Sequence, residues 1–148
     1  MIAFSSKNFY ELTTQELYQI LALRAEVFVV EQNCPYQDVD GKDPKSIHVL
    51  GYLDNHLVAY ARLLEQGISY KDYASIGRVV TLPSVRGKSY GHALVDFSIA
   101  VCQKKFPGQN IKISAQAHLE KFYNEHGFKA TGESYLEDDI PHIGMILA

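Results

Sequence analysis

The chain has 148 residues, of which 47% are hydrophobic, and its formal net charge is −3 at pH 7. This length is that of one domain, so we expect residues 1–148 to form a single unit around its own core. A slightly acidic chain is not expected to bind nucleic acid. No apolar run approaches the roughly 20 residues that a membrane-spanning helix requires, so no membrane partner is expected.

Targeting and redox signals are sparse. The start of the chain, MIAFSSKNFYEL, lacks the basic segment followed by an apolar stretch that marks a signal peptide. The two cysteines, Cys34 and Cys102, form no metal-binding pattern, and cysteines of this kind usually serve as small buried hydrophobic side chains. The sequence therefore predicts a reduced cytoplasmic protein without a metal.

Residues 13–32 are predicted to form the first helix. Thr13 and Glu16 have the spacing of a capping box, in which a hydroxyl and a carboxylate satisfy free backbone N–H groups. Apolar residues then recur at helical spacing along one stripe: Leu17, Ile20, Leu21, Val27 and Phe28. Arg24 falls on the same stripe, where an arginine either recognises a carboxylate or phosphate or extends its charged end to solvent.

A loop is expected at residues 33–46, which are rich in proline, aspartate and glycine. Its aspartates at positions 38, 40 and 43 suggest part of a calcium-binding loop. An EF-hand loop beginning at Asp38 would need glycine at its sixth position and glutamate at its twelfth, but those positions hold Asp43 and Val49. We therefore expect a solvated acidic loop that binds no metal.

Strands and two more helices make up the rest of the chain. Residues 47–53 and 57–64 flank a turn at residues 54–56 and are predicted to form a hairpin. Further strands are expected at residues 73–82, 111–115, 128–137 and 142–148. The second and third helices are expected at residues 90–106 and 118–127. This order predicts an α/β domain in which helices cover the faces of a mixed sheet.

Basic residues and glycines separate the buried strand from the second helix, in the stretch RGKSYG at residues 86–91. The first N–H groups of a helix lack partners within it, and glycine lets a ligand approach the backbone closely. Such a turn suits a phosphate or pyrophosphate, although a plain loop with solvated basic side chains has the same composition. A P-loop would need glycine where Leu82 stands, and the fingerprint GxGxxG fails because Gly87 and Gly91 are four apart.

The same stretch carries a family resemblance. Residues 77–94, GRVVTLPSVRGKSYGHAL, resemble motif A of the GCN5-related N-acetyltransferases, whose signature is Arg/Gln-x-x-Gly-x-Gly/Ala after a strand. Arg86, Tyr90 and Gly91 fit this signature, whereas Ser89 stands where the first glycine is usual.

Three other stretches extend the resemblance along nearly the whole chain. Residues 115–128, AQAHLEKFYNEHGF, resemble the following motif B, and residues 23–43 and 137–145 are similar to the ElaA-like subfamily. The resemblance implies a mixed, mostly antiparallel central sheet with helices on both faces. It also implies a parallel strand pair that splays apart, with acetyl-CoA lying in the gap.

Cofactor contacts follow from the resemblance by position. Val79, Val80 and Thr81 would offer backbone groups to the pantetheine arm. The residues expected around the pyrophosphate are Arg86, Gly87, Lys88, Ser89, Tyr90, Gly91 and His92. Ala117 lies where the third helix is expected to approach the cofactor.

The implied reaction transfers an acetyl group to an amine by direct attack. Resemblance to motif B places Tyr123 beside the coenzyme sulfur as its proton donor, unless it is a packed helix tyrosine. PHIGM resembles a segment of glyphosate-type N-acetyltransferases in which the histidine is the base, so His142 is the candidate base. A strand histidine bonded to backbone is the alternative. Glu31 and then His118 follow as candidates.

The acceptor is expected to be a primary amine of a small molecule or peptide. If Arg24 or Arg78 lines its pocket, the acceptor would carry an anionic group beside the amine, and Glu31 is a further candidate contact.

Two other functions remain open at this point: a non-catalytic protein that senses acyl-CoA or scaffolds a partner, and an NTP-binding protein. Both a monomer and a homodimer are compatible with the sequence.

Overall fold

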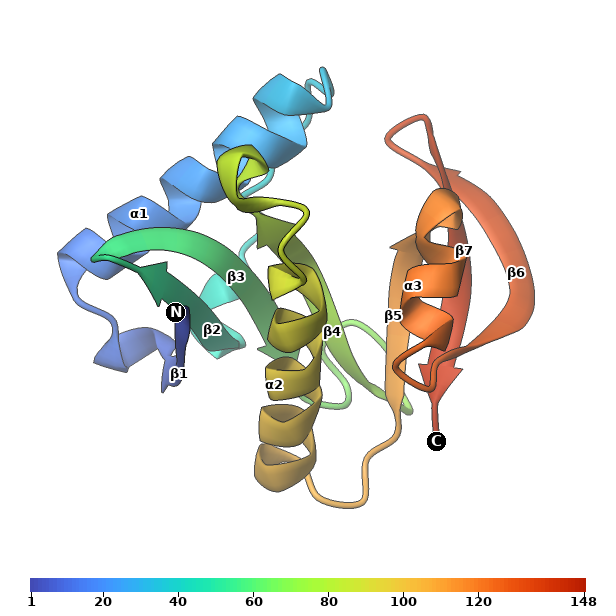
Figure 1. Cartoon of the computed structure of the whole chain (residues 1–148). Coiled ribbons are helices and arrows are strands. Elements are labelled where there is room, and N and C mark those ends of the chain that lie inside the picture. The colour runs from blue at the N-terminus through green and yellow to red at the C-terminus, as the bar shows by residue number, and fades with distance from the viewer.

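The computed structural model describes residues 1–148 as a seven-stranded sheet flanked by helices (Figure 1). The strands are β1 (Ala3–Asn8), β2 (Ile47–Leu53), β3 (His56–Leu64), β4 (Ala74–Thr81), β5 (Ile111–Gln116), β6 (Lys129–Glu137) and β7 (Ile140–Leu147). Their spatial order is β1-β2-β3-β4-β5-β7-β6, and only the β4–β5 pair is parallel. The predicted α/β class with a mixed, mostly antiparallel sheet is confirmed.

The main helices are α1 (Thr14–Arg24), α2 (Tyr90–Lys105) and the short α3 (Glu120–Asn124). Residues Ala25–Glu31 continue α1 as a π-helix, and one 3₁₀ turn at Ala117–Leu119 precedes α3. The capping box predicted at the start of α1 is present, because the Thr13 hydroxyl accepts from the Glu16 N–H and the Glu16 carboxylate accepts from the Thr13 N–H. None of the helices is both long and apolar enough to span a bilayer.

Alternation along the strands divides the core between the two faces of the sheet. Val49 and Ala59 pack with residues of α2 and α3, whereas their neighbours Leu50 and Tyr60 pack with α1. Successive strand residues point to opposite faces, so each strand serves both layers. The predicted placement of helices on both faces is confirmed.

The turn between β2 and β3 explains why the hairpin was predictable. Asp54 and Asn55 both have positive φ, 49° and 67°. Two consecutive left-handed residues form the tight turn that matches the twist of a hairpin, and Asp and Asn tolerate that conformation better than other non-glycine residues.

The parallel pair parts soon after it forms. β4 and β5 are paired only at Ala74 with Ile111 and at Ser75 with Lys112. Beyond Ser75, β4 remains paired with β3, with an irregular register near Arg78, whose φ is +47°. Figure 1 shows the two strands diverging towards the N-terminal end of α2. The splayed pair expected from the family resemblance is therefore present, and it opens the sheet.

Two elements differ from the sequence-based expectations. β1 was not predicted because AFSSKN holds mostly small and polar residues, as an edge strand paired only with β2 permits. The expected third helix, 118–127, is shorter, because its first residues form the 3₁₀ turn and α3 ends at Asn124.

Candidate active site

The N-terminus of α2 is left without a side-chain cap. Its N-cap, Ser89, has the left-handed conformation (φ 64°), and its side chain makes no capping hydrogen bond. Gly87 is also left-handed, with φ 84°. Because Ser89 holds a conformation that favours glycine, the turn keeps the shape that a glycine would give it. The first N–H groups of α2 therefore have no side-chain cap and suit an anion.

A hollow of about 350 Å³ lies in front of this turn, and we call it the phosphate pocket. Its lining residues are Thr81, Val85, Arg86, Gly87, Ser89, Tyr90, Gly91, His92 and Phe122. Six of the residues predicted for the pyrophosphate thus gather here, whereas Lys88 is exposed and is not part of the lining. Their cofactor-binding roles stay predictions.

Arg86 is already paired within the protein. Its guanidinium donates to both carboxylate oxygens of Glu31, at 2.7 and 2.9 Å, and to the Thr81 carbonyl at 3.0 Å. The hydrogen bond from Arg86 lowers the pKa of the Glu31 carboxyl. Glu31 therefore lies beside the phosphate pocket without lining it. It also lies outside the second cavity, described next, so the structure does not support it as a base or acceptor contact.

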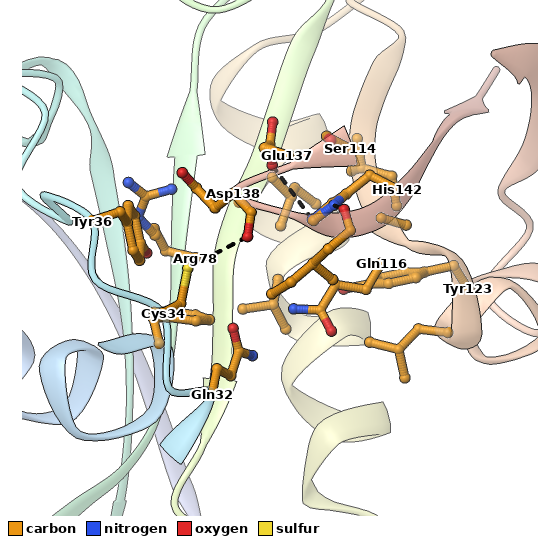
Figure 2. A pocket seen from close by; sticks show the side chains of 18 of the residues that line it. Gln32, Cys34, Tyr36, Arg78, Ser114, Gln116, Tyr123, Glu137, Asp138 and His142 are labelled. Atoms are coloured by element: carbon orange, nitrogen blue, oxygen red, sulfur yellow. Dashed lines mark hydrogen bonds and ion pairs between the residues drawn. The ribbon is translucent and has the colours of Figure 1, made fainter. Parts of the chain in front are cut away.

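A second cavity, of about 330 Å³, opens where β4 and β5 part, and we call it the central cavity (Figure 2). Val79 of β4, Ala115 of β5 and Tyr123 of α3 are among its walls. β4 and α3 line both hollows, because Val79 and Tyr123 line the central cavity whereas Thr81 and Phe122 line the phosphate pocket. A ligand with a phosphate end and an extended arm can therefore occupy both by following β4. Val80 turns its side chain into the core, and Ala117 lines neither hollow.

Tyr123 extends from α3 towards the middle of the central cavity, beside Gln116 (Figure 2). Its ring packs edge-on against Phe122 and Phe128, with centroids 5.0 and 5.9 Å away, and its side chain is 8% exposed. Burial raises the pKa of Tyr123 to about 12. The hydroxyl therefore stays protonated at neutral pH, where it can donate a hydrogen bond.

His142 lines the same cavity from β7, where it is paired with Gln116 of β5 (Figure 2). Its Nδ1 is 2.7 Å from the Ile140 carbonyl, which can only accept, so Nδ1 carries the proton in the neutral ring. Nε2 is then a free acceptor, with the Glu137 carboxylate 3.4 Å away. The ring is thus held in the tautomer that a base needs.

Charged side chains of both signs line the central cavity. Glu137 ends β6 and Asp138 follows it in the turn to β7, whereas Arg78 comes from β4. Arg78 is paired with the carboxylate of Asp38 at 2.7 Å and donates to the Asp38 carbonyl at 2.9 Å. Arg78 thus lines the central cavity with much of its charge already neutralised, and its contact with an acceptor stays a prediction.

Arg24 is placed differently from the sequence-based expectation. It is completely buried and lines neither hollow, so it cannot touch an acceptor. Its guanidinium donates to Asp38 at 2.7 Å and to Asp43 at 2.8 Å. Burial alone would lower the pKa of Arg24, but the hydrogen bond to Asp43 and the charges of both aspartates outweigh burial and raise it. Its role is to hold the loop that forms the cavity wall.

The acidic loop was expected to be solvated, but two of its three aspartates, Asp38 and Asp43, are buried, whereas Asp40 stays exposed. Asp40 and Asp43 also accept from Arg62 of β3, at 2.8 and 3.0 Å. Three arginines from α1, β3 and β4 thus meet three aspartates of one loop, and we call this set the ion-pair cluster: Arg24, Arg62, Arg78, Asp38, Asp40 and Asp43. The signal in the sequence was three arginines inside apolar segments beside three closely spaced aspartates.

Residues that carry no recognisable motif of their own also line the central cavity. Gln32, Cys34 and Tyr36 line it from the loop after the π-helix, and Glu137 and Asp138 line it from the last hairpin. The Cys34 sulfur is 3.6 Å from the Asp138 carbonyl, which joins these two segments (Figure 2). Burial and the nearby charges of Asp138 and Asp139 raise the pKa of the Cys34 thiol, so it is not a ready nucleophile.

Comparison with known proteins places this architecture in a family. Residues 11–148 match the family described as "Acetyltransferase (GNAT) domain". The chain is 43% identical over 147 residues to Protein ElaA of Escherichia coli K12, an alignment that covers 98% of this chain and 95% of that protein. It is 42% identical over 146 residues to the UPF0039 protein sll0451 of Synechocystis, covering 98% of this chain and 94% of that protein.

Solved structures of related proteins have the same fold. A crystal structure of an acyl-CoA N-acyltransferase from Pseudomonas aeruginosa is 43% identical, with a TM-score of 0.94 and full coverage of both chains. An aminoglycoside 6′-N-acetyltransferase complexed with coenzyme A shares the fold, with a TM-score of 0.72 at 16% identity over 97% of this chain and 95% of that one. The parted strands, the uncapped turn before α2 and these full-length matches lead to one conclusion: the chain belongs to the GNAT family of acyltransferases.

Proposed function

We propose that the protein transfers an acetyl group from acetyl-CoA to a primary amine of a small molecule or peptide, by direct attack within a ternary complex. One observation carries the proposal: the parting of β4 and β5 joins an uncapped helix N-terminus to a cavity that holds Tyr123 and His142. Holding the thioester and the amine side by side supplies proximity without an enzyme nucleophile.

The residues present fit the coenzyme. The free N–H groups at the start of α2 suit a pyrophosphate, which is favoured at a helix N-terminus. Beyond Ser75, the edge of β4 that faces β5 has no strand partner, and its backbone groups suit the amide-bearing pantetheine arm. Bound in this way, acetyl-CoA would present its acetyl thioester to the central cavity.

The reaction must deprotonate the amine, stabilise the tetrahedral oxyanion and stabilise the departing sulfur, and groups in or beside the central cavity can meet each of these needs. An alkyl amine has a pKa of roughly 10 and must lose a proton, which Nε2 of His142 can accept. Glu137, 3.4 Å from Nε2, stabilises the imidazolium that results. A backbone N–H near Val80 can donate to the tetrahedral oxyanion, and the Tyr123 hydroxyl can donate to the departing sulfur.

A ligand and product assay tests the proposal. Coenzyme A is expected to raise the melting temperature and ATP–Mg²⁺ is not, because a ligand of the native state stabilises by mass action. Release of free thiol from acetyl-CoA is then followed with amino acids, polyamines, aminoglycosides and peptides, and the acetylated amine is identified by mass. Stabilisation by coenzyme A without acetylation of any amine would favour the acyl-CoA sensor, and protection by ATP–Mg²⁺ alone would favour the NTP-binding protein.

The base is tested by its effect on the pH–rate profile. His142→Gln is expected to lower kcat by about 10²- to 10⁴-fold, the usual contribution of general base catalysis. It should also flatten the rise of kcat with pH, because no imidazole remains to lose a proton. Glu137→Gln keeps the imidazole and should keep the rise. A His142→Gln profile with the same rise as wild type would remove His142 as the base.

A further inference from the structure

We propose that Asp96, His126 and His92 form a proton relay that couples coenzyme binding to the uptake of one proton at the phosphate pocket. This inference rests on the proposed function. The three side chains make a continuous chain of hydrogen bonds: the Asp96 carboxylate is 2.8 Å from Nδ1 of His126, and Nε2 of His126 is 2.9 Å from Nδ1 of His92. The chain joins α2 to the end of α3.

The hydrogen bonds fix the tautomer of each neutral ring. A carboxylate can only accept, so Nδ1 of His126 carries its proton and Nε2 is a bare acceptor. Nδ1 of His92 must then donate to that acceptor, which leaves Nε2 of His92 without a proton. With both rings neutral, His92 therefore presents a lone pair at its free nitrogen.

That free nitrogen belongs to a ring that lines the phosphate pocket. The His92 side chain is 41% exposed and stacks on Phe122, with ring centroids 4.5 Å apart. The other ionisable residues that line the pocket are Arg86, which is held by Glu31, and Tyr90. From the α3 side, the Glu125 carboxylate lies 3.6 Å from Nε2 of His92, and the His126 side chain is only 5% exposed.

One added proton reverses the hydrogen-bonding role of His92. If the proton resides on His92, Nε2 carries N–H and a positive charge. If it resides on His126, that ring donates to Nδ1 of His92, and His92 again carries N–H at Nε2. In both cases Nε2 becomes a donor that can bind a phosphate oxygen, whereas the bare lone pair of the neutral pair repels one. The cation also relieves the repulsion between Glu125 and an incoming phosphate.

The sign of the pH dependence follows directly. Binding that takes up a proton weakens as the pH rises, by at most about tenfold for each pH unit. The total change is expected to be about 10- to 100-fold, the size of one hydrogen bond to a charged group. Asp96 and His126 are positioning residues in this scheme, because they set the protonation of His92 without touching the coenzyme.

Titration calorimetry with coenzyme A between pH 5.5 and 8.5 tests the inference. In wild type, affinity should fall as the pH rises, and comparison of buffers with different ionisation enthalpies should show proton uptake. His92→Phe keeps the stacking on Phe122 and removes the donor. It should therefore weaken binding by about 10- to 100-fold at low pH, to the level of wild type at high pH, and show no proton uptake. His56→Phe, at the exposed first residue of β3, is the matched control and should behave as wild type.

A second variant separates the relay from simple packing. Asp96→Asn removes an exposed carboxylate that stabilises the protonated pair, so the loss of affinity should begin at lower pH. Dephospho-coenzyme A, which lacks the 3′-phosphate and its ionisation near pH 6, identifies the phosphate that His92 contacts. An unchanged pH dependence of the affinity assigns the contact to the pyrophosphate. A lost pH dependence assigns the contact to the 3′-phosphate. Equal losses from His92→Phe at every pH, or none, would overturn the relay alone. No binding of coenzyme A at any pH would overturn the proposed function.

Discussion

Tyr123→Phe is expected to lower kcat for acetyl transfer by about 10²- to 10³-fold while the affinity for acetyl-CoA changes little. The substitution keeps the ring and its edge-on contacts with Phe122 and Phe128, and it removes only the hydroxyl that faces the cavity. The coenzyme is expected to be held mainly by the turn before α2, which lines the phosphate pocket, whereas Tyr123 lines the central cavity. The loss should therefore fall on the chemical step.

The pKa of Tyr123 refines how it acts. A phenol with a pKa of about 12 does not readily give up its proton to a thiolate whose conjugate acid has a pKa near 8.5 by analogy with cysteine. Tyr123 is therefore expected to stabilise the sulfur by a hydrogen bond as negative charge develops on it. Single-turnover kinetics with saturating acetyl-CoA measures this effect, and Tyr10→Phe, on an exposed ring, is the control. A variant Tyr123→Phe with wild-type kcat would show that the sulfur leaves without its help.

Local patterns in the sequence predicted the elements that depend on local chemistry. The capping box of α1 and the Asp54-Asn55 turn involve residues that are close in sequence, so spacing alone was enough. The composition of the turn before α2 left an anion site and a plain loop both open, and the absence of a side-chain cap at Ser89 favours the anion site. The parting of β4 and β5 came only from the family resemblance, since no composition or periodicity marks where two paired strands separate.

Contacts between residues that are far apart in the sequence could not be predicted, because only the folded chain brings them together. The partners of the ion-pair cluster are 14 to 40 residues apart in the chain, so the aspartates of the loop could not be matched with their arginines before the fold was known. The same holds for His92 and His126, which are 34 residues apart. Arg24 was correctly predicted to lie on the inward stripe of its helix, but its partner is the loop of the protein itself and not a ligand.

Asp43→Asn is expected to reduce the free energy of unfolding by about 3–5 kcal/mol, because breaking a buried pair leaves uncompensated charge. Asp43 is 5% exposed and accepts from both Arg24 and Arg62, at 2.8 and 3.0 Å. A loss of this size is a large share of the typical 5–15 kcal/mol of a domain. Urea unfolding at pH 7 measures it. Glu133→Gln, which breaks the pair of the exposed Glu133 with Lys112, is the control and should change the free energy of unfolding far less.

The pH dependence of that stability has a definite sign. Burial alone would raise the pKa of Asp43, but the hydrogen bonds and charges of Arg24 and Arg62 outweigh burial and lower it. A carboxyl with a lowered folded-state pKa contributes its full stability above the unfolded value of about 3.9 and loses it as the pH falls through the folded value. Wild type should therefore lose stability below pH 4 more steeply than Asp43→Asn. Parallel acid-unfolding curves for the two proteins would contradict the assignment.

A double variant separates the charge of the cluster from its role in shaping the site. Arg24→Met combined with Asp43→Leu removes a buried pair together, so it should recover part of the stability that Asp43→Asn loses. Asp38 would lose one of its two arginines and keep Arg78, whose side chain forms the wall of the central cavity. If the ion-pair cluster positions that wall, the double variant folds but its KM for the amine rises while its affinity for coenzyme A does not change. An unchanged KM would show that the loop keeps its shape by packing, without the help of these charges.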